Sequence, residues 1–236
     1  MSGILSDLTG QVVVVTGGSS GIGAAATEAF QSLGASVIVA DLASIPAVNV
    51  TDPASVQALA DRVGRDYGKC DIIVTSAGAV AAGAPDSLDD ETWDRLFSVN
   101  VKGVWRVIDA LLPLMGEGGS IVNVSSGAGL RPGADISAYA ASKGAVIAYS
   151  RALAVDLASR GIRVNCVAPG VIDTPMHRVA QAERRPAAAD AAAKHVNYLV
   201  QRDGTAPEVA NAIVLLATNG YITGSTLAVD GGRTLH

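Results

Sequence analysis

Cysteine is scarce in this sequence, and the chain has neither a basic block nor a long apolar run. Only two of its 236 residues are cysteines, Cys70 and Cys166, and they stand far apart. Two isolated cysteines are too few for a disulfide framework or a zinc site. We therefore predict no bound metal, and this cysteine usage fits a reducing compartment.

The balance of charge excludes two classes of partner. Lysine and arginine number 17 against 22 aspartate and glutamate residues, which gives a formal net charge of -5. Because no basic patch is present, we expect neither nucleic acid nor an anionic membrane surface as a partner. No apolar run reaches membrane-spanning length, and no basic segment precedes a short apolar one. We therefore expect a soluble, cytoplasmic protein.

Apolar runs alternate with helical segments along the chain, beginning with a βαβ unit. The runs are continuously apolar, as expected of parallel strands buried on both faces. We predict one α/β domain over residues 1–236, a Rossmann-like doubly wound parallel sheet with helices on both faces. Strands are expected at residues 11–16, 36–40, about 47–50, 72–76, 120–125, 163–168 and 226–229. Helices are expected at residues 24–33, 53–67, 89–115, 137–160 and 207–217.

Two segments depart from this regular alternation. Residues 41–48 are too few for a helical crossover, which needs at least about 10 residues, so we predict a loop there. Residues 175–204 are rich in alanine and arginine and follow the end of a predicted strand. We predict that this segment forms one or two short helices and acts as a lid over the substrate.

A glycine-rich loop follows the first predicted strand and reads Thr-Gly-Gly-Ser-Ser-Gly-Ile-Gly over residues 16–23. Glycines there permit a tight turn and a close approach of the backbone to a pyrophosphate, and the next helix offers it unpaired N–H groups. The spacing alone is also compatible with a plain tight turn. Its place in a βαβ unit favours a dinucleotide site, with contacts from Gly17, Ser19, Ser20, Gly21, Ile22 and Gly23.

Asp41 stands at the end of the second predicted strand. A carboxylate in this position accepts hydrogen bonds from the adenosine ribose hydroxyls and repels a 2'-phosphate. Neither Ser19, Ser20 nor Leu42 supplies a cation that would reverse this preference. We therefore predict NAD as the cofactor in preference to NADP. The competing interpretation of Asp41, a solvated acid at a strand end, is the weaker one.

Tyr139 and Lys143 are four residues apart in a predicted helix, so they share one of its faces. A free phenol has a pKa of about 10, but a neighbouring ammonium stabilises the phenolate and lowers that pKa. The pair is then able to move a proton near neutral pH. A half-buried tyrosine beside a solvent-reaching lysine gives the same spacing, so the pair alone leaves both interpretations open.

Taken in order, these motifs resemble the short-chain dehydrogenase/reductase family from residue 8 to residue 232. The glycine loop is similar to the family's T-G-x-x-x-G-x-G motif, and Tyr139 with Lys143 is similar to its Y-x-x-x-K motif. Ser126 precedes Tyr139 by the interval of the family's catalytic serine, and Asn100 matches its helix asparagine. Further matches lie at residues 167–174, 221–224 and 229–232.

The resemblance implies a role for each group. Ser126 would bind the substrate oxygen, Tyr139 would exchange its proton, and Lys143 would bind the nicotinamide ribose and tune Tyr139. Asn100 would hold a water at a helix distortion and relay protons, and bridging of the backbone is its alternative role. Further cofactor contacts are expected from Leu42, Asn49, Val50, Ser76, Ala77, Gly78, Tyr139, Lys143, Pro169, Gly170, Ile172 and Thr174.

Two departures from the family pattern concern the cofactor. Residues 75–78 read Thr-Ser-Ala-Gly where the family commonly has Asn-Asn-Ala-Gly, which removes amide hydrogen bonds and puts the rigidity of this segment in question. Asn49 stands where the family frequently has an aspartate that contacts adenine. Because an amide still donates and accepts there, we expect a changed affinity and the same cofactor.

The substrate is expected to be a small molecule with an alcohol or carbonyl group. Arg131, Arg184 and Arg185 are candidates for binding an acidic substrate, although arginines on loops are more often merely solvated. Several of the expected pocket residues are small, which leaves room for a bulky or cyclic secondary alcohol. The expected pocket residues are Gly127, Ala128, Arg131, Ile136, Ala168 and Pro169.

Three functions are therefore open. The first is an NAD-dependent oxidoreductase that interconverts a secondary alcohol and a ketone, with a homotetramer or dimer implied by the resemblance. The second is an NADPH-dependent 3-oxoacyl thioester reductase; Asp41 and the lack of a basic cluster for an acyl carrier protein argue against it. The third is a catalytically inactive nucleotide-binding regulatory protein, against which the complete set of Asn100, Ser126, Tyr139 and Lys143 argues.

Overall fold

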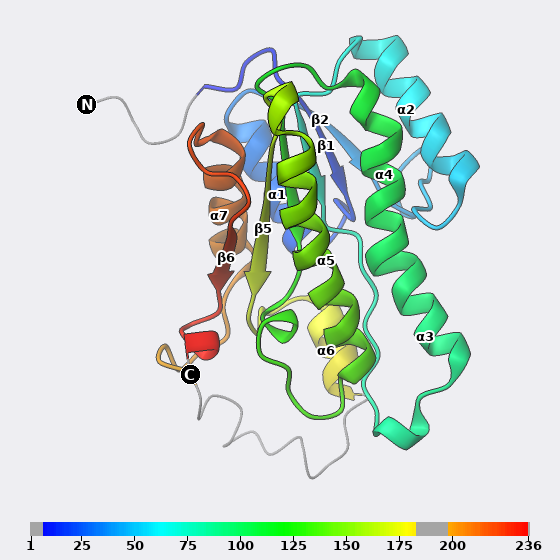
Figure 1. Ribbon diagram of the computed structural model, residues 1–236, viewed down its shortest axis with the longest axis vertical. Helices are drawn as coiled ribbons and strands as arrows, with labels where there is room; N and C mark the ends of the chain where they lie inside the picture. The colour runs from blue at the N-terminus through cyan, green and yellow to red at the C-terminus, as the bar shows by residue number, and fades with distance from the viewer. Residues whose placement is uncertain (1–6, 183–197, 236) are drawn as a thin grey trace.

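The computed structural model describes residues 7–182 and 198–235, which fold around one parallel sheet (Figure 1). Its six strands lie in the order β2-β1-β3-β4-β5-β6, and every neighbouring pair is parallel. The order changes direction between β1 and β3, as in a doubly wound sheet. The strands are β1 (Val12–Thr16), β2 (Ser36–Ala40), β3 (Ile72–Thr75), β4 (Ser120–Val124), β5 (Arg163–Pro169) and β6 (Thr226–Val229).

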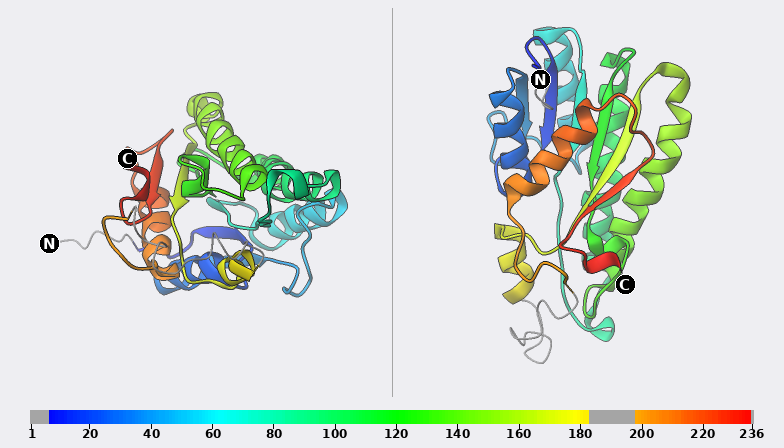
Figure 2. Two further views of the ribbon diagram at one scale, coloured as in Figure 1. Left: turned by 90° about the horizontal axis from the view of Figure 1, so that it is seen from below. Right: turned by 90° about the vertical axis from the view of Figure 1, so that its left-hand side faces the viewer.

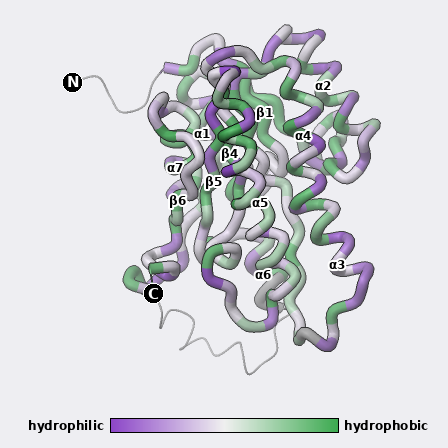
Figure 3. Tube along the Cα trace, viewed as in Figure 1, coloured by the Kyte–Doolittle hydropathy of each residue, from purple (hydrophilic) through white to green (hydrophobic). Residues whose placement is uncertain are grey.

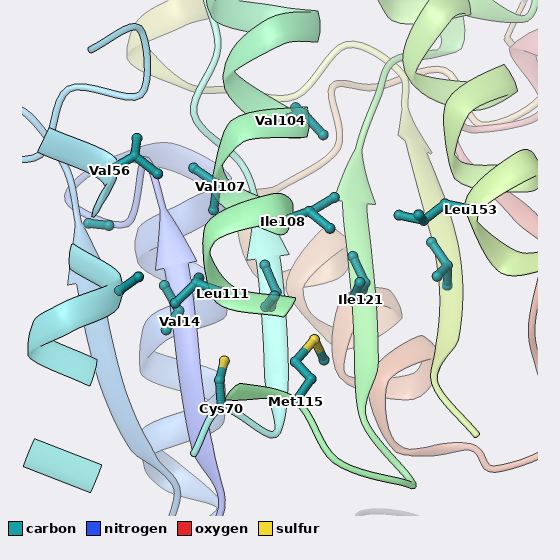
Figure 4. Close-up of a cluster of buried hydrophobic side chains, with 14 of the residues drawn as sticks. Val14, Val56, Cys70, Val104, Val107, Ile108, Leu111, Met115, Ile121 and Leu153 are labelled. Atoms are coloured by element: carbon teal, nitrogen blue, oxygen red, sulfur yellow. The ribbon is translucent and has the colours of Figure 1, made fainter. Parts of the chain in front are cut away.

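Helices cover both faces of the sheet (Figure 2). On one face, Phe30 of α1 and Ile213 of α7 share a buried cluster with Val13 of β1. On the other face, α2, α4 and α5 pack on Val14 and contribute residues such as Leu111 (Figure 4). The helices are α1 (Gly21–Ser32), α2 (Pro53–Tyr67), α3 (Asp90–Phe97), α4 (Gly103–Leu111), α5 (Ser137–Asp156), α6 (Pro175–Ala182) and α7 (Ala206–Thr218).

The double cover explains why the strands are apolar throughout. Every residue of β1 is buried, and its alternate side chains point to opposite faces. Val13 and Val15 join the cluster under α1 and α7, whereas Val12 and Val14 join the cluster under α2, α4 and α5. Figure 3 shows hydrophobic residues along the strands and hydrophilic ones along α3. The predicted fold class is therefore confirmed.

The segment after β2 contains no helix, as predicted, but the short strand predicted at about residues 47–50 does not form. The chain folds back on Asp41 instead. The Val48 N–H donates to the Asp41 carbonyl (2.8 Å), and Ser44 Oγ donates to the same carbonyl (2.7 Å). Because these polar groups form hydrogen bonds within the loop, they do not pair with a neighbouring strand.

The long helix predicted over residues 89–115 is interrupted. After α3 the chain makes a π-helical turn at Ser98–Lys102, and α4 begins at Gly103. The helix distortion that the resemblance implied at Asn100 is therefore present. α4 ends in a short 3₁₀ turn, Leu112–Leu114, which contains a proline that lacks the N–H an α-helix requires.

The predicted lid falls partly within the described residues. α6 supplies a short helix at its start, and a bridge between Gly204 and Ile172 returns its end to the sheet. Residues 183–197, with Arg184, Arg185 and His195, lie outside the described residues. Across residues 7–182 and 198–235, no helix combines the length and the apolar character needed to cross a membrane.

Candidate active site

The carboxyl ends of the parallel strands open into a cavity of about 1180 Å³. Open α/β sheets bind ligands at this edge, where the strand order reverses. Most of the predicted site residues line this cavity. They are Gly17, Ser20, Gly21, Ile22, Asp41, Leu42, Asn49, Val50, Ser76, Ala77, Gly78, Ser126, Tyr139, Lys143, Pro169, Gly170, Ile172 and Thr174.

Three predicted residues, Ser19, Gly23 and Asn100, do not line the cavity. Gly23 packs under the glycine loop, where a Cβ would stand 2.1 Å from the carbonyl oxygen of Gly17. Asn100 is fully buried. Ser19 is exposed, and its N–H donates to the carboxylate of Asp41 (3.1 Å). Gly23 and Asn100 therefore support the cavity from beneath, whereas Ser19 lies at the surface of the molecule.

The glycine loop forms a cradle without side chains. Gly17 has a φ of 66°, and a Cβ there would lie 2.7 Å from the backbone nitrogen of Ala77, so only glycine fits. α1 begins at Gly21, and no side chain caps its first turn, which leaves backbone N–H groups for an anion. Thr16 Oγ1 accepts the Ala77 N–H (3.2 Å) and holds the loop against the end of β3. This cradle fits the pyrophosphate of a dinucleotide.

Asp41 lines the cavity directly after β2, where the sequence predicts the adenosine of the cofactor. Its Oδ2 accepts the Ser19 N–H (3.1 Å), and its Oδ1 accepts the Ala43 N–H (3.0 Å). A carboxylate oxygen accepts more than one hydrogen bond, so both oxygens still have capacity for ribose hydroxyls. The lining residues next to it carry no cation in the described chain: Leu42, Val48, Asn49, Val50 and Thr51.

Asn100 bridges the segment after β3 to two helical elements. Its Oδ1 accepts the Ala79 N–H (2.7 Å), and its Nδ2 donates to the Ala79 carbonyl (2.9 Å) and to Ser142 Oγ (2.9 Å). These bonds tie Ala79 to the π-helical turn and to α5, and the effect of the missing asparagines on rigidity stays a prediction. They also show Asn100 in its alternative role as a backbone bridge, and its proton relay stays a prediction.

Ser126, Tyr139 and Lys143 meet where β4 ends against α5. Tyr139 lies close enough to Ser126 for its pKa to respond to the Ser126 side chain, and Ser126 Oγ accepts the Ala128 N–H (3.1 Å). Lys143 Nζ lies 5.9 Å from the centre of the Tyr139 ring and donates to the Val124 carbonyl (3.0 Å). The helix of α5 and the strand end therefore place a proton donor, a hydroxyl partner and an ammonium in one corner of the cavity.

The pKa values in this corner differ from the expectation. Burial raises the pKa of Tyr139, and the nearby Ser126 side chain offsets only part of this rise. Burial also lowers the pKa of Lys143 to about 8, because desolvation penalises the ammonium. In this arrangement the ammonium is directed to the Val124 carbonyl. The prediction that Lys143 lowers the pKa of Tyr139 is therefore wrong for the geometry that the structure shows.

The substrate end of the cavity was predicted in part. Arg131 does not line it, because Arg131 Nη1 donates to the Arg233 carbonyl (2.9 Å) instead of facing the cavity. Ala168 is fully buried within β5. Of the expected pocket residues, the cavity is lined by Ala128, Ile136 and Pro169, and it is not lined by Gly127, Arg131 and Ala168.

The predicted lid, residues 175–204, supplies three further lining residues, as the sequence predicts: Met176, His177 and Tyr198. Arg233 also lines the cavity and was not among the predicted site residues. It comes from the turn after β6. Its signal in the sequence was its place directly after the Asp-Gly-Gly motif at residues 230–232.

Comparison with known proteins agrees with this geometry. Residues 16–234 match the family model described as Enoyl-(Acyl carrier protein) reductase. A 3-oxoacyl-[acyl-carrier-protein] reductase of Thermotoga maritima is 36% identical over 250 residues, which cover 97% of this chain and 99% of that protein. A cis-4-hydroxycyclohexanecarboxylate dehydrogenase of Sinomonas cyclohexanicum is 37% identical over 246 residues, which cover 95% and 96%.

Solved structures give the same result. An aldohexose dehydrogenase of Thermoplasma acidophilum has a TM-score of 0.90 and 34% identity, with 98% of this chain and 97% of that chain covered. A short chain dehydrogenase from Burkholderia cenocepacia in complex with NADP has a TM-score of 0.86 and 34% identity, with 97% and 99% covered. The chain belongs to the short-chain dehydrogenase/reductase family.

As a short-chain dehydrogenase/reductase, the chain is an oxidoreductase with a Rossmann-like fold that uses a nicotinamide dinucleotide. Several relatives are named 3-oxoacyl-[acyl-carrier-protein] reductase. Among the solved relatives, one is in complex with NADP and another with NADPH.

Proposed function

We propose that this protein catalyses the reversible reduction of a ketone to a secondary alcohol, with Tyr139 as the group that gives and takes the proton. The observation that carries this proposal is the grouping of Ser126, Tyr139 and Lys143 in one cavity, with Lys143 Nζ 5.9 Å from the centre of the Tyr139 ring. The glycine cradle and Asp41 bind a nicotinamide dinucleotide in the same cavity.

Each of these three residues has a separate role in the proposed reaction. Ser126 hydrogen-bonds the substrate oxygen and holds it beside the Tyr139 hydroxyl, which then transfers its proton. A bound nicotinamide dinucleotide supplies or accepts the hydride. Lys143 would bind the nicotinamide ribose of a bound cofactor, a role that the family resemblance implies. In the structure its Nζ donates to the Val124 carbonyl at the edge of the same cavity.

We include a preference for NAD in this proposal. It rests on the carboxylate of Asp41 and on the uncharged residues that flank it in the cavity. A 2'-phosphate at this end would meet a negative charge with no neighbouring cation from the described residues, and like-charge contacts of this kind are costly. The NADP held by the solved Burkholderia cenocepacia relative argues for the opposite preference, so direct binding decides the matter.

Two substrate classes follow from the names of the relatives. Those named 3-oxoacyl-[acyl-carrier-protein] reductase favour a 3-oxoacyl thioester, which is therefore the second candidate for the reaction's substrate. The relative named cis-4-hydroxycyclohexanecarboxylate dehydrogenase supports a secondary alcohol on a ring. Both classes present a ketone or a secondary alcohol to Tyr139, so the chemistry of the corner is the same.

The first experiment is a titration of the purified protein with NADH and with NADPH, followed by nicotinamide fluorescence. Tighter binding of NADH supports the proposed preference, and tighter binding of NADPH overturns it and favours the thioester reductase. Turnover is then measured on ring alcohols, ring ketones and a 3-oxoacyl thioester, with Tyr139→Phe as the inactive control. Loss of turnover by about 100-fold or more in that variant supports its role as proton donor. Equal turnover by parent and variant contradicts it.

A homo-oligomer, either a tetramer or a dimer, and a cytoplasmic location are also part of this proposal, and they rest on the family resemblance. Light scattering after size-exclusion chromatography tests the oligomeric state. A molar mass close to 23.7 kDa, the mass of one chain, contradicts the assembly.

A further inference from the structure

The guanidinium of Arg233 lies at the substrate end of the cavity. Arg233 begins the 3₁₀ turn Arg233–Leu235 after β6, and its half-buried side chain lines the cavity together with Tyr139. Its Nη1 would lie 3.6 Å from a Cβ at Gly127, and its Nη2 would lie 3.6 Å from a Cβ at Gly133. Arg233 therefore lies over the loop that joins Ser126 to α5.

Hydrogen bonds hold Arg233 in this place. The Asp230 carboxylate accepts the N–H groups of Gly232 (3.0 Å) and Thr234 (2.9 Å), which orders the turn that carries Arg233. Arg233 Nη1 donates to the Arg131 carbonyl (2.8 Å), and Arg131 Nη1 donates to the Arg233 carbonyl (2.9 Å). The reciprocal pair fixes one side of the Arg233 guanidinium and leaves its other side toward the cavity.

Arg233 forms no close ion pair within residues 7–182 and 198–235. The nearby Asp230 carboxylate accepts backbone N–H groups of the turn instead. Asp41 is the acidic residue among the described residues that line the cavity, and it belongs to the adenosine end. A guanidinium has five N–H donors, and the hydrogen bond to Arg131 uses one of them. A partly desolvated guanidinium with donors to spare matches the planar, bidentate geometry of a carboxylate.

We propose that Arg233 binds a carboxylate of the substrate, so that the substrate is a secondary alcohol or ketone with a carboxylate away from the reacting carbon. This inference rests on the proposed function of the same cavity. One guanidinium balances one negative charge, which favours a carboxylate over a phosphate dianion. Ser126 and Tyr139 hold the oxygen that reacts, while Arg233 holds the opposite end of the molecule and orients it.

Binding tests this proposal without any need for turnover. The protein saturated with its preferred reduced cofactor is titrated with cyclohexanecarboxylate, cyclohexanecarboxamide and cyclohexyl phosphate, followed by nicotinamide fluorescence. We expect the carboxylate to bind about 10- to 100-fold more tightly than the amide, as is typical of a charge-assisted hydrogen bond. Equal affinity for carboxylate and amide overturns the proposal, and so does tighter binding of the phosphate ester.

Variants assign the effect to Arg233. Arg233→Gln should remove the advantage of the carboxylate over the amide, whereas Arg65→Gln, which removes an exposed arginine of α2, should keep it. Arg233→Lys keeps the positive charge but lacks the planar guanidinium, so the ratio of carboxylate to amide affinity should lie between those of the parent and of Arg233→Gln. It serves as the second variant if the glutamine variant does not fold. An unchanged ratio in a folded Arg233 variant contradicts the assignment.

Turnover separates this inference from the proposed function. Hydroxycyclohexanecarboxylates with the hydroxyl at ring position 3 or 4 are compared with their methyl esters as substrates. If parent protein oxidises acids and esters equally well, the proposed reaction stands and the carboxylate site fails. If neither cofactor binds, the proposed function fails, and calorimetry with cyclohexanecarboxylate and cyclohexanecarboxamide then tests Arg233 alone.

Discussion

The buried charge of Lys143 lowers the stability of the folded protein, and replacing Lys143 with methionine should stabilise the protein at neutral pH. Its side chain is almost completely buried, and its ammonium donates one hydrogen bond, to the Val124 carbonyl. Burial lowers its pKa from an ordinary 10.5 to about 8. At about 1.4 kcal/mol per pKa unit, this difference corresponds to about 3 kcal/mol of destabilisation when the residue is charged in the folded state.

The sign of the pH dependence follows from these two pKa values. Below about pH 8 the lysine is charged in both states, so the whole cost is present. Between about pH 8 and about pH 10.5 the unfolded chain keeps the proton that the folded chain has lost, so the cost disappears as the pH rises. The advantage of Lys143→Met over the parent should therefore fall by about 2.5 kcal/mol between about pH 7 and about pH 10.

Urea unfolding of both proteins, without added cofactor, at the two pH values measures this change. Loss of the bond to Val124 and the new packing of methionine are independent of pH, so they cancel from the comparison. Cys70, whose pKa burial raises, is present in both proteins and cancels as well. Cys166 interacts electrostatically with Lys143, so both proteins carry Cys166→Ala in this comparison. Lys102→Met, at an exposed lysine, is the control. A stability difference between parent and Lys143→Met that stays constant with pH would refute the reasoning.

Three further predictions concern the cofactor end and the segment below it. Asp41→Asn removes the negative charge next to the ribose, so the affinity for NADPH relative to NADH should rise at least about tenfold in fluorescence titrations; an unchanged ratio contradicts the role of Asp41. Asn100→Ala leaves the buried backbone groups of Ala79 without the amide, and urea unfolding should show a loss of about 2–4 kcal/mol. Gly17→Ala forces a Cβ to within 2.7 Å of the Ala77 nitrogen at a φ of 66°. It should weaken NADH binding at least about tenfold, and full affinity would contradict the cradle.

The parts of the site that depend on local structure could be predicted from the sequence. Gly17 and Asp41 belong to one βαβ unit, in which strand, turn and helix are close along the chain, so their roles follow from the order of the elements. Tyr139 and Lys143 share a helix face because of their spacing. Ser126, by contrast, became a candidate through the family resemblance, and the structure then placed it beside Tyr139.

Two predictions failed because a group has a different hydrogen-bond partner from the expected one, in one case within a loop and in the other across the fold. The loop after β2 does not form a strand. Its own N–H and hydroxyl groups donate hydrogen bonds to the Asp41 carbonyl instead. The ammonium of Lys143 is directed to a carbonyl of β4, so its effect on Tyr139 differs from the one that helix spacing predicts. In both cases the pattern identified the correct residue, and packing decided its partner.

The sequence by itself determined the α/β class, the cofactor cradle and the pairing of Tyr139 with Lys143, because hydrophobic periodicity and helix spacing act over a few residues. Only the tertiary structure decided which arginine faces the substrate. Arg131 and Arg233 are 102 residues apart and exchange hydrogen bonds with each other's carbonyls, yet only Arg233 lines the cavity. The orientation of a long side chain depends on the hydrogen-bond acceptors and the free space around it in the folded protein. Residues close to it in the sequence do not determine either of these.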